Sequence, residues 1–133
     1  MFTRIHNIAI AVKNVEEAVK LYTDSFGFQV SRSVTVPELG IKSAFLPIGD
    51  ATIELMEPID PQQGPVAKFL QNRGEGIYLI ELEVEDMDSA IQSLSEKGVQ
   101  LLGADPESRA KGSQVFIHPR SSRGVLIELI QRK

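Results

Sequence analysis

The chain contains one sequence pattern twice. The run NIAIAVKNVEEAVKLYTDSFGF begins at Asn7, and a similar run, LIELEVEDMDSAIQSLSEKGV, begins 72 positions later at Leu79 (79 − 7 = 72). Each copy then ends on a similar segment, ATIELMEP or GVLIELIQ, which puts Glu54 and Glu128 at equivalent positions. A single copy of such a unit cannot bury its own apolar face, so the repeat predicts two modules that pair. The pairing predicts one central cleft that receives a carboxylate from each copy.

The composition is typical of a single soluble domain. A length of 133 residues is enough to bury a hydrophobic core. The net charge of -4 argues against a nucleic-acid partner, which would require a basic face. The chain contains no cysteine, which excludes disulfides and thiolate metal sites. It also lacks an apolar run of the roughly 20 residues that a membrane span needs, and its start does not read as a secretory signal, so we expect a cytoplasmic protein without a membrane partner.

The spacing of apolar residues predicts the same order of elements in both copies. In the first copy, alternation over 2–12 predicts a strand, Asn14 a helix N-cap and Gly27 the end of that helix. In the second copy, Asp86 and Gly98 delimit the equivalent helix. The further predicted elements are strands at 28–34, 41–47, 51–57, 78–84, 99–102, 114–118 and 125–131, with a short helix at 66–72.

These elements predict an α+β fold made of two βαβββ modules. We expect one domain over residues 1–133, in which module one is 1–57, a connector is 58–75 and module two is 76–133.

Four stretches carry a resemblance to a known family: IAIAVKNVEEAVKLY, VPELGIKSAFLPIGDATIELMEP, GPVAKFLQNRGEGI and HPRSSRGVLIEL. Together they resemble the vicinal-oxygen-chelate (glyoxalase and bleomycin-resistance) superfamily, and within it the methylmalonyl-CoA epimerase group. The resemblance implies a glyoxalase-like fold, a homodimer and a small-molecule substrate such as an acyl-CoA. It also implies an isomerase or lyase activity, in which a metal stabilises the enolate formed when a base removes the proton next to a carbonyl.

The resemblance further implies two metal ligands from each module, a histidine on the first strand and a Glu or Gln on the last. Carried over by position, the last-strand ligands are Glu54 and Glu128, whereas the two histidine positions hold Asn7 and Leu79. An amide is a poor ligand beside imidazole and leucine has no donor atom. We therefore expect no metal cofactor and a degraded metal site. A divalent metal would need a non-standard site in which Glu54 and Glu128 are joined by Glu81 or by His6.

The neighbours of the missing ligands are assigned by strand alternation. Asn7, Leu79 and Glu81 are expected to line the cleft, and a charge at the cleft rim satisfied by Lys or Arg is the alternative for Glu81. His6 lies one residue before Asn7 and therefore points to the opposite face, unless a local bulge turns it inward.

The two carboxylates are the predicted catalytic groups. Each lies between apolar residues that should face the helices, so that Glu54 and Glu128 face the cleft as an acid–base pair. The alternative is that internal hydrogen bonds hold both of them without any catalytic role. Arg120 and Arg123 flank the HPRSSRG turn and are predicted to bind a phosphate or carboxylate of an acyl-CoA, while His118 is interpreted as a turn residue. The competing hypothesis is a non-catalytic small-molecule-binding protein of the bleomycin-resistance type.

Overall fold

The computed structural model describes residues 1–133, and these form two compact units. The first-copy unit contains residues 7–78, and the second-copy unit contains residues 1–6 together with 79–133. Strands β1 (Phe2–Ala11) and β5 (Gly76–Val84) contribute residues to both units. None of the helices combines the length and the apolar character that crossing a membrane requires.

The order of elements is the predicted βαβββ twice, with a helix between the copies. The remaining strands are β2 (Arg32–Val36), β3 (Ile41–Ile48), β4 (Ala51–Pro58), β6 (Leu101–Leu102), β7 (Val115–Ile117) and β8 (Ile127–Gln131). The α-helices are α1 (Val15–Asp24), α2 (Pro65–Arg73), α3 (Met87–Glu96) and α4 (Pro106–Ala110), and η1 (Pro37–Leu39) and η2 (Pro119–Ser121) are single 3-10 turns. The α+β architecture is confirmed, and α2 is the predicted connector helix.

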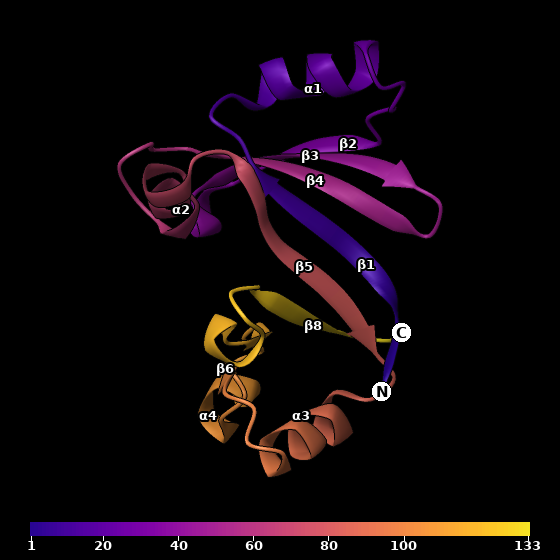
Figure 1. Cartoon of the computed structure of the whole chain (residues 1–133), viewed down its shortest axis with the longest axis vertical. Coiled ribbons are helices and arrows are strands. Elements are labelled where there is room, and N and C mark those ends of the chain that lie inside the picture. The colour runs from indigo at the N-terminus through magenta and orange to yellow at the C-terminus, as the bar shows by residue number, and fades with distance from the viewer. The chain divides into compact units, whose positions relative to one another are not determined.

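In the first-copy unit the strands are hydrogen-bonded in the order β2-β3-β4-β1. β1 runs parallel to β4, and the connection between them passes through α1, β2 and β3, while β3 is antiparallel to both β2 and β4. Helix α1 covers one face of these strands (Figure 1). The buried members of the core between them are Val12, Val15, Ala44, Leu46 and Leu55.

The second-copy unit repeats this plan with shorter strands. Here β5 runs parallel to β8, and the order continues through β7 to β6. Helix α3 supplies apolar side chains to the core, which also takes side chains from β5, β7 and β8. The buried members of that core are Val84, Met87, Ala90, Leu94, Val115, Ile117 and Leu129.

The start of the long helix is built in the same way in both copies. Asn14 accepts a hydrogen bond from the Glu17 N–H at 2.9 Å, and Asp86 accepts one from the Ser89 N–H at 3.1 Å, so both predicted N-caps are confirmed. A second group reaches each helix from the last strand of its module. Glu57 accepts the Val15 N–H at 2.9 Å in the first copy, and Gln131 accepts the Met87 N–H at 2.6 Å in the second.

One predicted strand is displaced. The sequence placed it at 28–34, but β2 begins only at Arg32. The physical reason is that Phe28 belongs to the helix terminus, since its N–H donates to the Tyr22 carbonyl at 3.1 Å. Its ring also packs against that of Tyr22 with centroids 5.8 Å apart, so an apolar residue that reads as the start of a strand is used to close the helix.

Candidate functional site

Glu54 lies in the middle of β4 and is buried, with 8% of its surface exposed. Two polar side chains from neighbouring strands bind its carboxylate. Asn7 of β1 donates from Nδ2 to Oε1 at 2.8 Å, and Ser43 of β3 donates from Oγ to Oε2 at 2.7 Å. Both donors are themselves 3% exposed. The result is a buried Glu54–Asn7–Ser43 cluster in which each carboxylate oxygen has a fixed donor.

The neighbours of Glu54 point the other way. Ile53 and Leu55 pack in the core that α1 covers, so the alternation of β4 directs Glu54 to the face away from that helix. The predicted packing of the flanking apolar residues on the helix side is confirmed, and a cleft on the side of Glu54 stays a prediction. The sequence reasoning included Asn7 but missed Ser43, whose only signal was a small polar residue at an inward position of an otherwise apolar strand.

Glu128 occupies the equivalent place in the second-copy unit. It lies in β8 with 6% of its surface exposed, and Ile127 and Leu129 on either side of it pack toward α3. Gln114 donates from Nε2 to its Oε2 at 3.2 Å. As in the first copy, the apolar neighbours face the helix and the carboxylate faces away from it. Gln114 was not singled out from the sequence, because it precedes β7 and has no periodic signal.

The residue beside each carboxylate differs between the copies. On the adjacent parallel strand, Ala9 is the register partner of Glu54, whereas Glu81 is the partner of Glu128. Paired residues on neighbouring strands point to the same face. The second-copy unit therefore has two acidic side chains where the first has one. Leu79, at the position of the second expected histidine, is buried with 8% exposed.

His6 and Tyr78 precede the two expected ligand positions and have different surroundings. The Nδ1 atom of His6 lies 3.1 Å from Nη2 of Arg4 in the second-copy unit. Tyr78 packs edge-on against Phe69 of α2 with ring centroids 5.3 Å apart, and burial raises the pKa of its phenol above the ordinary value.

The HPRSSRG segment forms a tight turn. His118 is the N-cap of η2 and accepts the Arg120 N–H on Nδ1 at 2.9 Å, which agrees with its interpretation as a turn residue. Arg120 and Arg123 are both exposed. Arg123 has a left-handed backbone with φ of 61°, a conformation that costs energy for any residue other than glycine. Their binding of a phosphate or carboxylate stays a prediction.

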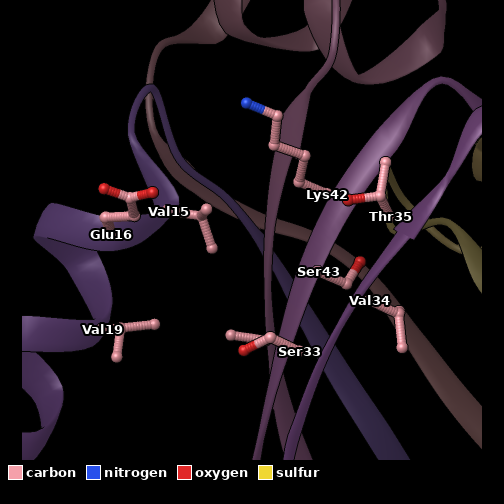
Figure 2. Close-up of a pocket in the computed structure, with 9 residues that line it drawn as sticks. Val15, Glu16, Val19, Ser33, Val34, Thr35, Lys42 and Ser43 are labelled. Carbon is pink, nitrogen blue, oxygen red and sulfur yellow. The ribbon is translucent and has the colours of Figure 1, made fainter.

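A cavity of about 380 Å³ lies between α1 and strands β2 and β3. Figure 2 shows Val15 and Val19 of α1 on one side, across from Ser33 and Lys42 on the other. The Lys42 ammonium lies 3.7 Å from Oε2 of Glu57, the residue that accepts the Val15 N–H. Glu54 does not line this cavity, which is therefore a feature of the helix side of the strands.

Comparison with known proteins identifies relatives along nearly the whole chain. Residues 6–117 match the family described as the Glyoxalase/Bleomycin resistance protein/Dioxygenase superfamily. The human mitochondrial methylmalonyl-CoA epimerase is 36% identical over 130 residues, which cover 96% of this chain and 73% of that protein. The ethylmalonyl-CoA/methylmalonyl-CoA epimerase of Cereibacter sphaeroides is 36% identical over 134 residues, which cover 98% of this chain and 99% of that protein.

A solved structure agrees with these sequence relatives. It is a methylmalonyl-CoA epimerase in complex with methylmalonyl-CoA and NH4+, which superimposes with a TM-score of 0.84 at 31% identity, covering 98% of this chain and 95% of that one. The predicted glyoxalase-like fold is thereby confirmed. The chain belongs to the glyoxalase/bleomycin resistance protein/dioxygenase superfamily and is a methylmalonyl-CoA epimerase-like member of it.

Proposed function

We propose that this protein is an epimerase that moves the proton next to the thioester carbonyl of an acyl-CoA, with Glu54 and Glu128 as the acid–base groups. The observation that carries the proposal is the pair of buried carboxylates at equivalent positions of the duplicated module. Both carboxylates are hydrogen-bonded, which offsets the cost of burying a charge, and one such group in each copy supplies the two acid–base groups that an epimerase needs. The relatives named as methylmalonyl-CoA epimerases give the substrate class.

The chemistry needs one group on each side of a carbon atom. One carboxylate removes the proton from the carbon, and the acid form of the other delivers a proton to the opposite side. The donors Asn7 and Ser43 hold Glu54 in one orientation, and Gln114 does the same for Glu128. A base that is already oriented avoids reorganisation during the reaction. One cleft shared by the two copies is the arrangement that the sequence duplication predicts, and this mechanism requires it.

We further propose that proton transfer here does not depend on a divalent metal. The family implies a metal site at the positions of Asn7, Glu54, Leu79 and Glu128. Asn7 directs its amide N–H group to Glu54, and Leu79 has no donor atom, so the donor set does not fit a site of the Zn, Co or Ni kind.

The test is deuterium exchange into methylmalonyl-CoA in D2O, performed with the full chain before and after treatment with a chelator. We expect exchange that survives chelation and that falls by about a hundredfold or more in Glu54→Gln and in Glu128→Gln, the scale of general acid–base catalysis. The matched control is Glu107→Gln, which removes one exposed carboxylate paired only with Lys111. Absence of exchange at high enzyme concentration would refute the epimerase assignment, and loss of exchange on chelation would refute metal independence.

A second candidate function is non-catalytic binding of an acyl-CoA. The observation that favours it is that both oxygens of Glu54 accept hydrogen bonds from the protein itself, which would serve a purely structural role equally well. Calorimetry with methylmalonyl-CoA separates the two. Binding without deuterium exchange supports the binding protein, and exchange supports the epimerase. The predicted homodimer, cytoplasmic location and lyase alternative stay predictions.

A further inference from the structure

A second cavity lies in the second-copy unit, and Glu81 and Glu128 are not among the residues that line it. It has a volume of about 330 Å³ and forms at the start of β1 and the ends of β5 and β8. The charged and titratable residues in its lining are Arg4, His6, Glu83, Arg132 and Lys133. Three cationic side chains therefore face one carboxylate side chain, a surplus of two positive side-chain charges (3 − 1 = 2). The whole chain has a net charge of -4, so this concentration of basic groups runs against the general composition.

One arginine of this cavity is held in place from two sides. The Nε atom of Arg4 lies 3.1 Å from Oε2 of Glu83, and its Nη2 lies 3.1 Å from Nδ1 of His6. A hydrogen bond from Thr3, followed by the contacts with Arg4 and the charge of Arg132, lowers the pKa of Glu83 and keeps it ionised. An arginine with a fixed guanidinium plane loses little conformational entropy when it binds an anion.

The balance of charge decides what this cavity accepts. Glu83 offsets the charge of Arg4, and the exposed Arg132 and Lys133 then give the cavity its positive surplus. Basic groups that converge on one small space favour a compact anion with several acceptor oxygens over an extended acidic surface.

We propose that this cavity binds a phosphate group of a small-molecule ligand. The choice of acyl-CoA as its source rests on the proposed function, because coenzyme A carries a 3′-phosphate and a diphosphate. Free phosphate or diphosphate has the same chemistry, and the experiment below distinguishes these sources. The competing location for such a phosphate is the exposed turn that carries Arg120 and Arg123.

The two histidines of the chain report on these two locations. His6 lines the cavity, and His118 caps the turn beside Arg120, so a ring resonance is available at each candidate site. The full chain is titrated at one pH with coenzyme A, with dephospho-coenzyme A, which lacks the 3′-phosphate, and with pyrophosphate. The imidazole signals are followed by NMR and the affinities by calorimetry. A His6→Gln variant assigns the two signals.

We expect the His6 signals to shift while those of His118 stay in place. Coenzyme A that binds more tightly than dephospho-coenzyme A indicates that the 3′-phosphate is the bound group, and pyrophosphate binding without this difference indicates a free phosphate as the source. Combined Arg132→Gln and Lys133→Gln substitution should weaken the tightest ligand about tenfold, the scale of charge-assisted hydrogen bonds. The control, Lys97→Gln with Lys111→Gln, removes the same charge from exposed positions elsewhere in the unit and should leave affinity within about twofold.

Shifts confined to His118, or a doubly substituted cavity that binds as tightly as the unsubstituted protein, would overturn the proposal. The result is independent of catalysis, because pyrophosphate has no carbon-bound proton next to a carbonyl. Phosphate binding in a chain that fails the deuterium-exchange test leaves this proposal standing and removes the epimerase. Deuterium exchange into methylmalonyl-CoA, without any shift of the His6 signals, would support the epimerase and refute the phosphate site.

Discussion

The Glu54–Asn7–Ser43 cluster shows how a buried charge is tolerated at the level of single residues. The carboxylate is nearly removed from solvent, yet each oxygen has a donor at 2.7 or 2.8 Å. Deleting one of these donors should lower the free energy of unfolding, because the carboxylate then stays buried with one hydrogen bond fewer. The sequence predicted Glu54 from the repeat and Asn7 from the family resemblance. Ser43 depended on which strand lies next to β4, and a single sequence does not give that pairing.

Ser43→Ala should therefore lower the free energy of unfolding by about 1 to 3 kcal/mol, because one donor to a buried charged group is lost. Denaturant unfolding measures the change. Ser33→Ala is the matched control, since Ser33 is an exposed residue of β2, and its substitution should change stability by less than about 0.5 kcal/mol. Equal effects of the two substitutions would mean that the hydrogen bond to Glu54 contributes nothing to stability.

At the level of elements, the two modules use the same device to begin their long helices. Besides the N-cap, a side chain from the last strand accepts the first N–H of the helix, Glu57 for α1 and Gln131 for α3. The caps were predictable because Asn14 and Asp86 precede apolar periodicity. The second contact was not, since it joins residues 42 or 44 positions apart. It also connects each helix to the strand that carries the buried glutamate.

Gln131→Ala should cost about 1 kcal/mol of unfolding free energy, the usual effect of losing a helix cap. The substitution removes the acceptor for the Met87 N–H and also the Nε2 donor to the Glu85 carbonyl at 2.8 Å. Denaturant unfolding measures the change. An unchanged free energy of unfolding would show that the contact from β8 does not stabilise the start of α3.

The N-cap of α3 should also be visible in its titration. Hydrogen bonds from the Ser89 side chain and N–H lower the pKa of the exposed Asp86 carboxyl. A depressed folded-state pKa means that the stabilisation is present above the unfolded pKa and is lost as pH falls through the folded value. We expect the Asp86 carboxyl signal in NMR to titrate below its ordinary range and to move upward in Ser89→Ala. No upward movement in that variant would contradict the assigned cause.

Two glycines separate backbone strain from steric collision. Gly98, after α3, and Gly103, after β6, have φ values of 81° and 76°. A Cβ at Gly98 meets nothing within 4 Å, whereas one at Gly103 would lie 2.0 Å from the Gln114 carbonyl oxygen. Gly98→Ala should cost about 1 kcal/mol from the left-handed backbone alone, and Gly103→Ala roughly 2 to 4 kcal/mol because β7 must also move. Thermal unfolding of both variants measures the difference, and equal losses would contradict it.

At the level of the whole molecule, the repeat carried most of what the sequence could predict. It gave the βαβββ order twice, the two caps and the side of each last strand on which Glu54 and Glu128 lie. Two kinds of feature could not be predicted from the repeat. Strand 28–34 was misplaced because Phe28 completes the helix terminus, a tertiary contact that overrides strand periodicity. The donors Ser43 and Gln114 were missed because each depends on strand pairing.

The duplication also supports the proposed function. A repeated module with a carboxylate in each copy suits a reaction that needs one proton donor and one proton acceptor. Glu81 beside Glu128, in place of Ala9 beside Glu54, makes the two copies chemically unequal. An experiment that starts from a single epimer addresses the claim without requiring the two carboxylates to be equivalent.

The most direct measurement follows the isotope during the first turnovers of one methylmalonyl-CoA epimer in D2O. Two separate acid–base groups predict that the product epimer carries deuterium while the recovered starting epimer keeps its proton. Glu54→Gln and Glu128→Gln should each abolish this product labelling. Early deuterium in the recovered starting epimer at the level found in the product would mean that one group serves both sides of the carbon, and would contradict the assignment of Glu54 and Glu128 as a pair.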